Sequence, residues 1–275
     1  MLNGVLNISL FEGDIAWGDK EKNISNLKKR INEIPQSTDI VVLPEFFSTG
    51  FMTEDKNTIF SLAEKNTDNT ISELHKLAKE HGVAIAGSFI AKTASRIYNR
   101  GFIIEPTGEE SFYDKRHLFS MAKEDAVFTK GNSLPVTLRY RGWNIMLIVC
   151  YDLRFPEWFR NIDNKYDILI VVANWPRVRE YAWRQLLIAR ALENGSYVCG
   201  VNRTGIDNHG IEYSGSSMVI DYKGQIVASN TPANPGKIIN ASLDLDALKE
   251  FRKKFPAWKD ADKYNFDPIY SDFSE

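Results

Sequence analysis

The sequence predicts an α/β protein of one domain, in which two β-sheets pack face to face and helices cover their outer faces, giving four layers in the order α/β/β/α. Continuous apolar runs at residues 40–43, 145–149 and 168–172 are typical of strands that are buried on both faces. The order of strands and helices begins again after residue 134, and no Pro-, Gly- or Ser-rich linker separates the two halves. We therefore interpret residues 1–275 as a single domain.

The first half alternates strands with helices and ends in a hairpin. Its predicted elements are a strand at 5–10, a helix carrying Ile24, Leu27, Ile31 and Ile34, a strand at 40–43, a helix carrying Ile71, Leu74, Leu77 and Ala78 that ends before Gly82, a strand at 83–90, and paired strands at 97–104 and 111–113. The hairpin adds antiparallel pairing to strands that are otherwise connected by crossovers.

The second half follows a long polar loop at 114–134, a length that is usually functional inside a compact domain. The elements predicted after this loop are a strand at 143–149, a helix at 155–162, a strand at 168–172, a helix at 178–194, a strand at 196–201, a hairpin turning at 222–224, and a helix carrying Leu245, Leu248, Phe251 and Phe255. Two apolar stripes on helix 178–194 indicate a subunit interface. The aromatic tail at 256–275 is expected to pack on the surface or on a partner subunit.

The composition excludes several classes of function. With 34 Lys and Arg against 36 Asp and Glu, the net charge is −2, and the interspersed signs leave no basic patch for nucleic acid or a membrane surface. No apolar segment is long enough to cross a membrane, and residues 1–14 lack the basic leader of a signal peptide. Two cysteines are too few for a disulfide framework or a structural zinc site, so we expect a cytoplasmic protein.

Cys150 directly follows the buried strand 143–149 and precedes a polar turn. A side chain at such a junction has a rigid support, and a following helix N-terminus would favour its thiolate form. Free cysteine also packs well as a small apolar side chain, so a core role is the alternative. This stretch alone does not decide between a nucleophile and a core residue.

Two charged residues at other strand ends complete a set with Cys150. Glu45 could accept the thiol proton, and Lys115 could stabilise the negative oxygen of a tetrahedral adduct together with the backbone N–H of Tyr151. The set fits attack on an amide or nitrile carbon. His117 is the histidine nearest to these residues in sequence, and we interpret it as loop packing. The histidines and carboxylates show no metal-ligand spacing.

Three segments resemble the signature segments of the nitrilase superfamily of carbon–nitrogen hydrolases: LPEFFSTGF at 43–51, YDKRHLF at 113–119 and CYDLRFPEW at 150–158. The sequence resembles the bacterial omega-amidases more closely still, because three further segments are similar to theirs: KGN at 130–132, VANWP at 172–176 and KFPAWKDADKY at 254–264. The resemblance implies an α/β/β/α sandwich, usually a homodimer, that hydrolyses small-molecule amides through a thioester without a metal or an organic cofactor.

The resemblance also assigns roles to residues. It makes Glu45 the general base, Lys115 the oxyanion stabiliser and Cys150 the nucleophile. It further implies that Glu124 is a second glutamate beside the lysine, whereas spacing alone would leave Glu124 as an exposed loop residue next to Asp125.

Omega-amidases act on 2-oxo acids that carry a terminal amide, such as 2-oxoglutaramate and 2-oxosuccinamate. The remote carboxylate of such a substrate is suited to a bidentate arginine, and Arg154 is the candidate, with an ion pair to Glu157 as the alternative. Aromatic residues are expected either to shape the pocket or to fill the core: Phe46, Phe119 and Trp175. Another superfamily amidase, a carbamoylase or nitrile hydrolase, and a non-catalytic binding protein are the remaining alternatives.

Overall fold

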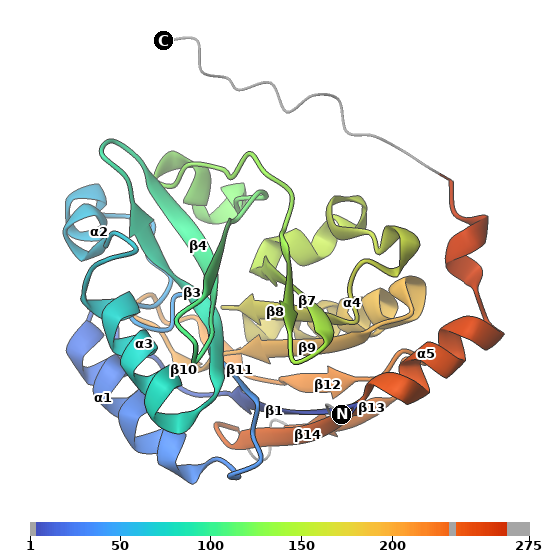
Figure 1. The fold of residues 1–275 in the computed structure, drawn as a ribbon. Helices are drawn as coiled ribbons and strands as arrows, with labels where there is room; N and C mark the ends of the chain where they lie inside the picture. Colours follow the sequence, from blue (N-terminus) through green and yellow to red (C-terminus); the bar gives the residue numbers. More distant parts are fainter. Residues whose placement is uncertain (1–3, 231–234, 263–275) are drawn as a thin grey trace.

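The computed structural model describes residues 4–230 and 235–262, and it contains two six-stranded sheets packed face to face (Figure 1). The first sheet has the order β14 (Ile238–Asp244), β1 (Val5–Phe11), β2 (Ile40–Val42), β3 (Ala84–Lys92), β4 (Ile97–Ile104) and β5 (Glu110–Asp114). The second has the order β13 (Ile226–Ser229), β12 (Met218–Ile220), β9 (Tyr197–Asn202), β8 (Ile168–Ala173), β7 (Trp143–Val149) and β6 (Thr137–Tyr140). A separate two-stranded ribbon joins β10 (Thr204–Ile206) to β11 (Glu212–Ser214).

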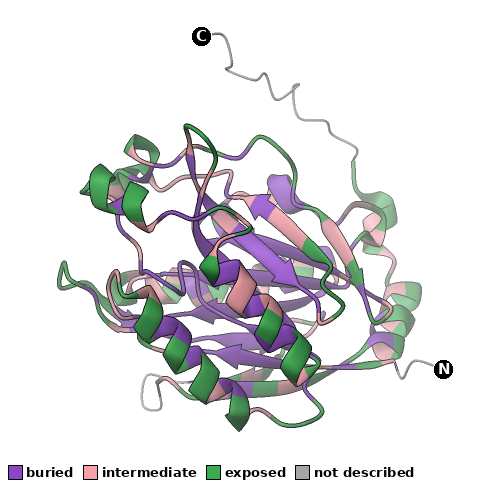
Figure 2. Ribbon diagram, turned by 60° about the vertical axis from the view of Figure 1, so that its left-hand side comes forward, coloured by how far each residue is buried: buried purple, intermediate pink, exposed green. Residues whose placement is uncertain are grey.

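Helices cover the outer faces of the two sheets, so the predicted α/β/β/α arrangement is confirmed (Figure 1). The α-helices are α1 (Lys20–Arg30), α2 (Lys56–Leu62), α3 (Asn69–His81), α4 (Glu180–Asn194) and α5 (Leu245–Lys254). One apolar cluster contains residues from both sheets and fills the space between them, and the buried strands form the centre of the molecule (Figure 2). The buried apolar area of the inner layers supplies the main drive for this packing.

The central strands of each sheet are parallel, which brings several strand ends to one edge. β1, β2 and β3 pair in parallel, as do β7, β8 and β9, while the outer strands pair antiparallel. Because β2, β7 and β8 have their carboxyl ends at the same side of the sandwich, the residues that follow them can meet there. This edge holds the candidate site.

Helix ends follow the local signals of the sequence. The predicted apolar face of α3 is buried, and the helix ends at Gly82, whose φ of 66° is the left-handed conformation that glycine adopts without strain. α4 ends in the same way at Gly195, with φ 51°. At α1, the Asp19 side chain accepts a hydrogen bond from the backbone N–H of Lys22 at 3.0 Å, which fixes the first turn.

The predicted helix at 155–162 is wrong. The chain from Cys150 forms three short 3₁₀ turns instead, at Cys150–Arg154, Pro156–Phe159 and Ile162–Asn164. Pro156 stands in the first turn, where proline is tolerated, but the backbone leaves the helical conformation at Arg160 (φ −55°, ψ 133°) and again at Asp163 (φ 56°), so no continuous α-helix forms here. Helix 178–194 begins two residues later than predicted, at Glu180, after the 3₁₀ turn Arg177–Arg179.

Several elements were not predicted: α2, β6, β10, β11, β14 and the remaining short 3₁₀ turns, which lie at Ile31–Glu33, Ser120–Ala122, Glu124–Ala126 and Ala257–Asp260. On α5, Leu245 and Leu248 are buried, but Phe255 is exposed and does not join them in the core. Of the two apolar stripes of α4, Trp183, Leu187 and Ala191 are buried, whereas Ala182, Leu186 and Ala189 stay half-buried, so the predicted subunit interface remains a prediction. Most of the predicted packing tail, from residue 263 onward, lies outside the described residues. Among the described helices none has the length and apolarity needed to span a membrane.

Candidate active site

The structure brings Glu45, Lys115, Glu124 and Cys150 together at the edge where β2, β5 and β7 end. The Lys115 Nζ donates to Glu45 Oε1 at 3.0 Å and to both carboxylate oxygens of Glu124 at 2.9 Å, and all three side chains are removed from solvent. Glu124, which spacing alone placed on an exposed loop, is fully buried. Its Oε2 also accepts the backbone N–H of Phe119 at 2.6 Å, which ties the 114–134 loop to the lysine.

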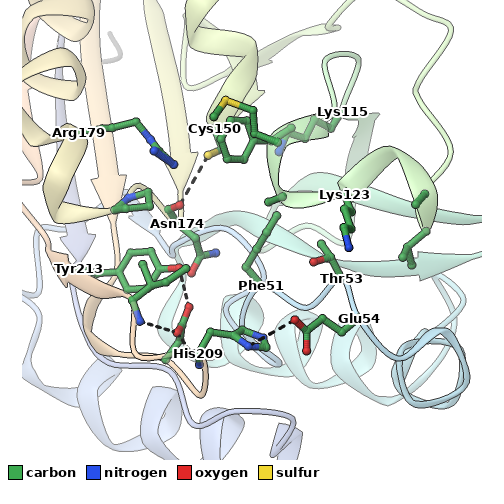
Figure 3. Close-up of a pocket in the computed structure, with 18 of the residues that line it drawn as sticks. Phe51, Thr53, Glu54, Lys115, Lys123, Cys150, Asn174, Arg179, His209 and Tyr213 are labelled. Atoms are coloured by element: carbon green, nitrogen blue, oxygen red, sulfur yellow. Dashed lines mark hydrogen bonds and ion pairs between the residues drawn. The ribbon is translucent and has the colours of Figure 1, made fainter.

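Cys150 stands at a strained turn between β7 and the following 3₁₀ turn. Its φ of 47° is a left-handed conformation that costs free energy for a residue with a Cβ atom, and such strain occurs where the surrounding structure holds a side chain in place. The Sγ atom lies 4.0 Å from the Asn174 carbonyl oxygen and borders the cavity drawn in Figure 3. The turn therefore presents the thiol at the end of a rigid strand.

The pKa of the Cys150 thiol is raised well above its usual range, so the expectation that a helix N-terminus would favour the thiolate is wrong. Burial is the main cause, and the negative charge of Glu45 adds to it more than the positive charge of Lys115 offsets. The resting thiol is consequently neutral at pH 7, and an attack through sulfur needs a base beside it.

Lys115 and Glu124 form a tightly coupled buried pair. Burial by itself would lower the pKa of Lys115, but the carboxylates of Glu124 and Glu45 outweigh it and raise that pKa, so the lysine is a permanent cation. Burial and the charge of Glu45 raise the pKa of Glu124, against the opposing effect of Lys115. One lysine between two carboxylates leaves the cluster with an excess of negative charge, which favours holding one proton on a carboxylate or on the thiol.

Two asparagines hold the carboxylates, and neither was singled out from the sequence. Asn99 on β4 donates from Nδ2 to Glu45 Oε1 at 2.7 Å and to Glu124 Oε1 at 3.2 Å. Asn174, directly after β8, donates its backbone N–H to Glu45 Oε2 at 2.8 Å and its Nδ2 to the Glu45 carbonyl oxygen at 2.6 Å. The sequence offered one signal for each: Asn99 is a polar residue within an apolar strand, and Asn174 is a polar residue directly after one.

Asp152 connects the turn at Cys150 with the segment that carries Lys115. Its buried carboxylate accepts the backbone N–H and Nδ1 of His117 at 2.9 and 2.8 Å, and the hydroxyl of Tyr113 at 2.9 Å. It also accepts the backbone N–H of Val149 at 3.3 Å. His117 stacks on Phe155 with ring centroids 4.0 Å apart, which agrees with the predicted packing role. Sequence reasoning missed Asp152 because a lone acidic residue in a turn resembles a solvated one.

A cavity of about 750 Å³ opens at Cys150 and Lys115 (Figure 3). Its other lining residues come from the loops around the site: Phe51, Thr53, Glu54, Lys56, Phe119, Met121, Ala122, Lys123, Ala126, Val127, Asn174, Pro176, Arg179, Asp207, His209, Ile211 and Tyr213. A narrow pocket of about 30 Å³ continues from Cys150 between Tyr151, Arg154, Trp175 and Arg179. In the described ranges no group of three or more His, Cys, Asp or Glu side chains converges as metal ligands would.

The predicted substrate-binding residues separate into two groups. Phe119 lines both pockets and Trp175 lines the narrow one, whereas Phe46 is fully buried and packs on Phe51 and Phe128, so its core interpretation is favoured. The Arg154 guanidinium lies 5.0 Å from the Trp175 ring centroid. Arg154 thus borders the narrow pocket, as the substrate-binding interpretation requires.

Comparisons with known proteins agree over nearly the whole chain. The sequence profile of the family described as carbon-nitrogen hydrolase matches residues 7–253. The omega-amidase YafV of Escherichia coli is 42% identical over 94% of this chain and 98% of its own length. A 2-oxoglutaramate amidase of Bacillus subtilis is 34% identical over 93% of this chain and 97% of its own. A crystal structure from Xanthomonas campestris, of a carbon–nitrogen hydrolase superfamily protein with an arsenic adduct in its active site, superimposes with a TM-score of 0.90 at 34% identity and covers 96% of this chain and 99% of that one.

Proposed function

Because the chain belongs to the carbon–nitrogen hydrolase family, we propose that it is an omega-amidase, which hydrolyses the terminal amide of 2-oxo dicarboxylic acid monoamides to the 2-oxo acid and ammonia. Relatives named as omega-amidase and 2-oxoglutaramate amidase, at 42% and 34% identity, support the substrate class. The structural observation that carries the proposal is the buried cluster of Glu45, Lys115 and Glu124 beside the Cys150 thiol at the cavity.

In the first step, Cys150 Sγ attacks the amide carbon while Glu45 accepts the thiol proton. This base is required because the thiol is neutral at rest. The amide oxygen becomes an oxyanion that Lys115 Nζ and the backbone N–H of Tyr151 stabilise, and the cationic lysine needs no protonation change to do so. The adduct then collapses as Glu45 passes its proton to the nitrogen, the carbon–nitrogen bond breaks, and ammonia leaves a thioester on Cys150.

In the second step, water hydrolyses the thioester. Glu45 accepts a proton from the water as its oxygen attacks the carbonyl carbon, and the same oxyanion site stabilises the second tetrahedral adduct. The carbon–sulfur bond then breaks, Cys150 Sγ recovers the proton, and the carboxylic acid product leaves. Asn99 and Asn174 keep Glu45 aimed at the reacting atoms in both steps, since they hold its two oxygens at 2.7 and 2.8 Å.

Arg154 supports recognition of a keto acid in this proposal. Its guanidinium lies at the narrow pocket next to Cys150, where its positive charge can attract the carboxylate of an incoming keto acid, while Phe119 and Trp175 shape the walls.

We further propose that the protein is a cytoplasmic homodimer, with the half-buried stripe of α4 at the interface. Light scattering on the purified protein measures the mass, and a monomer at micromolar concentration would contradict the dimer.

The test of the reaction measures ammonia release from 2-oxoglutaramate and the mass of the intact protein during turnover. We expect a transient acyl adduct on Cys150 that Cys150→Ala cannot form. Glu45→Gln should retain the fold and lose at least about 100-fold in kcat. Ammonia release that survives in Cys150→Ala would contradict the mechanism, and a preference for carbamoyl amino acids or nitriles in the same assay would contradict the substrate class.

A further inference from the structure

Arg179 faces the nucleophile from the turn that follows β8. It lines both the large cavity and the narrow pocket together with Cys150, and Figure 3 shows its guanidinium pointing toward Cys150 and Asn174. The turn itself is fixed. The Arg179 backbone N–H donates to the Pro176 carbonyl at 2.9 Å, and its carbonyl accepts from Trp175 Nε1 at 2.9 Å. The side chain therefore starts from a rigid base close to the reacting atoms.

The charges next to Arg179 are already engaged elsewhere. Arg177 pairs with Glu212, and Glu180 accepts hydrogen bonds from the hydroxyls of Ser214 and Ser216 at 2.8 and 2.6 Å. The ion pairs that this turn makes with described residues do not include Arg179. Its guanidinium instead lies 5.2 Å from the centroid of the Phe119 ring, so among the described residues this half-buried cation borders the cavity outside any ion pair.

We infer that Arg179 is a specificity-determining residue that binds the carboxylate remote from the scissile amide. This inference rests on the proposed function and deepens it. A planar guanidinium presents two parallel N–H donors to a carboxylate, and contact with the Phe119 ring limits its rotamers before the substrate arrives. Arg154 borders the same narrow pocket, but it is exposed, so solvent screens it more strongly. The half-buried Arg179 makes the stronger contact.

Two lysines are the rival cations in the large cavity. Lys56 and Lys123 both line it, and both are exposed at its rim. A hydrated ammonium on a flexible chain attracts an anion toward the opening but does not fix its orientation. Removing Arg179 and removing a rim lysine should therefore have different effects on the preference for substrates that carry the remote carboxylate.

The experiment compares two substrates that differ only in the remote group. 2-Oxoglutaramate carries the carboxylate, and levulinamide has a methyl group in its place with the same ketone and amide. We expect Arg179→Gln to lower kcat/KM for 2-oxoglutaramate by about 10- to 100-fold, mainly through KM, and for levulinamide by less than about threefold. Arg179→Lys should recover part of the loss. Arg177→Gln, an exposed arginine on the same turn, is the matched control and should leave both substrates unchanged.

An equal loss for both substrates in Arg179→Gln would overturn the inference, because it would indicate a structural role. A loss in Lys123→Gln as large as in Arg179→Gln would also overturn it, in favour of rim charge. If the wild-type protein releases no ammonia from 2-oxoglutaramate, the proposed function fails instead. Calorimetry of Cys150→Ala with 2-oxoglutarate, with and without Arg179→Gln, then tests the arginine alone, and equal affinities would overturn its role.

Discussion

Replacing Asp152 by Asn should damage both stability and catalysis, although Asp152 is not itself assigned a chemical step. An ionised aspartate only accepts hydrogen bonds, and the two oxygens of Asp152 accept four, two from His117 and one each from Tyr113 and Val149. An asparagine of the same shape replaces one of these oxygens with an NH₂ donor. Whichever way the amide turns, this donor faces another donor.

The size of the effect follows from which donor loses its partner. If the NH₂ group replaces Oδ1, it meets the backbone N–H of His117, and if it replaces Oδ2, it meets the backbone N–H of Val149. A buried N–H without a partner costs about 1–3 kcal/mol, and the loss of charge assistance in the remaining bonds brings the expected destabilisation to about 2–4 kcal/mol. Because Val149 precedes Cys150 and His117 lies two residues after Lys115, kcat should also fall by about 100-fold.

Urea unfolding followed by tryptophan fluorescence measures the stability, and ammonia release measures kcat. Asp125→Asn is the control, since Asp125 is exposed in the 114–134 loop and its replacement should change the free energy of unfolding by less than about 0.5 kcal/mol. A change below about 1 kcal/mol in Asp152→Asn, with kcat within threefold of wild type, would refute the reasoning that this carboxylate aligns the two segments.

Further predictions concern the buried cluster and the loop that holds it. Glu124→Gln should lower kcat by about 100-fold or more, because Lys115 is then neutralised by Glu45 alone. Steady-state kinetics on the folded variant measure kcat, and a loss of less than about tenfold would contradict this prediction. Since the folded Cys150 thiol has a raised pKa, the stability it contributes is fully present below the unfolded value of about 8.5 and is lost as the pH rises toward the folded one. Thiolate absorbance should therefore show no step for this cysteine below pH of about 8.5, and an earlier step that Cys150→Ala removes would count against it. Gly131→Ala should destabilise the protein by at least about 2 kcal/mol in urea unfolding, because a Cβ atom there would lie 1.9 Å from a backbone oxygen, and unchanged stability would show that the loop can shift freely.

Much of the fold could be predicted from local patterns, and the failures have local causes. Buried parallel strands have no polar face, so the runs at β7 and β8 were recognisable by apolarity alone. The helix expected at 155–162 failed because the segment turns out of the helical conformation at Arg160 and Asp163, and the apolar spacing does not reveal these turns. β10 and β11 are three residues each, which is too short for a periodic signal.

The candidate site divides in the same way. Glu45 and Cys150 follow strands, so their positions at a sheet edge could be inferred from the chain, and the resemblance to a known family added Glu124. Asn99, Asp152 and Arg179 could not be found in this manner. Their importance comes from the residues they contact, which are distant in sequence. The two glutamates bound by Asn99 lie 54 and 25 residues from it, and His117 and Tyr113 lie 35 and 39 residues from Asp152.

The sequence by itself predicted the layer order and placed Cys150 and Glu45, the candidate nucleophile and base, at strand ends, because each of these depends on residue type and on position relative to a strand. Only the tertiary structure decided the protonation state of the thiol. Burial and the charge of Glu45 raise the pKa of Cys150, and this outweighs any lowering of that pKa by the local turn. It also decided which arginine faces the cavity at close range, since Arg154 turns onto Trp175 while the half-buried Arg179 points toward the nucleophile. Electrostatic interactions depend on distance and burial, and the packing of the two sheets sets both.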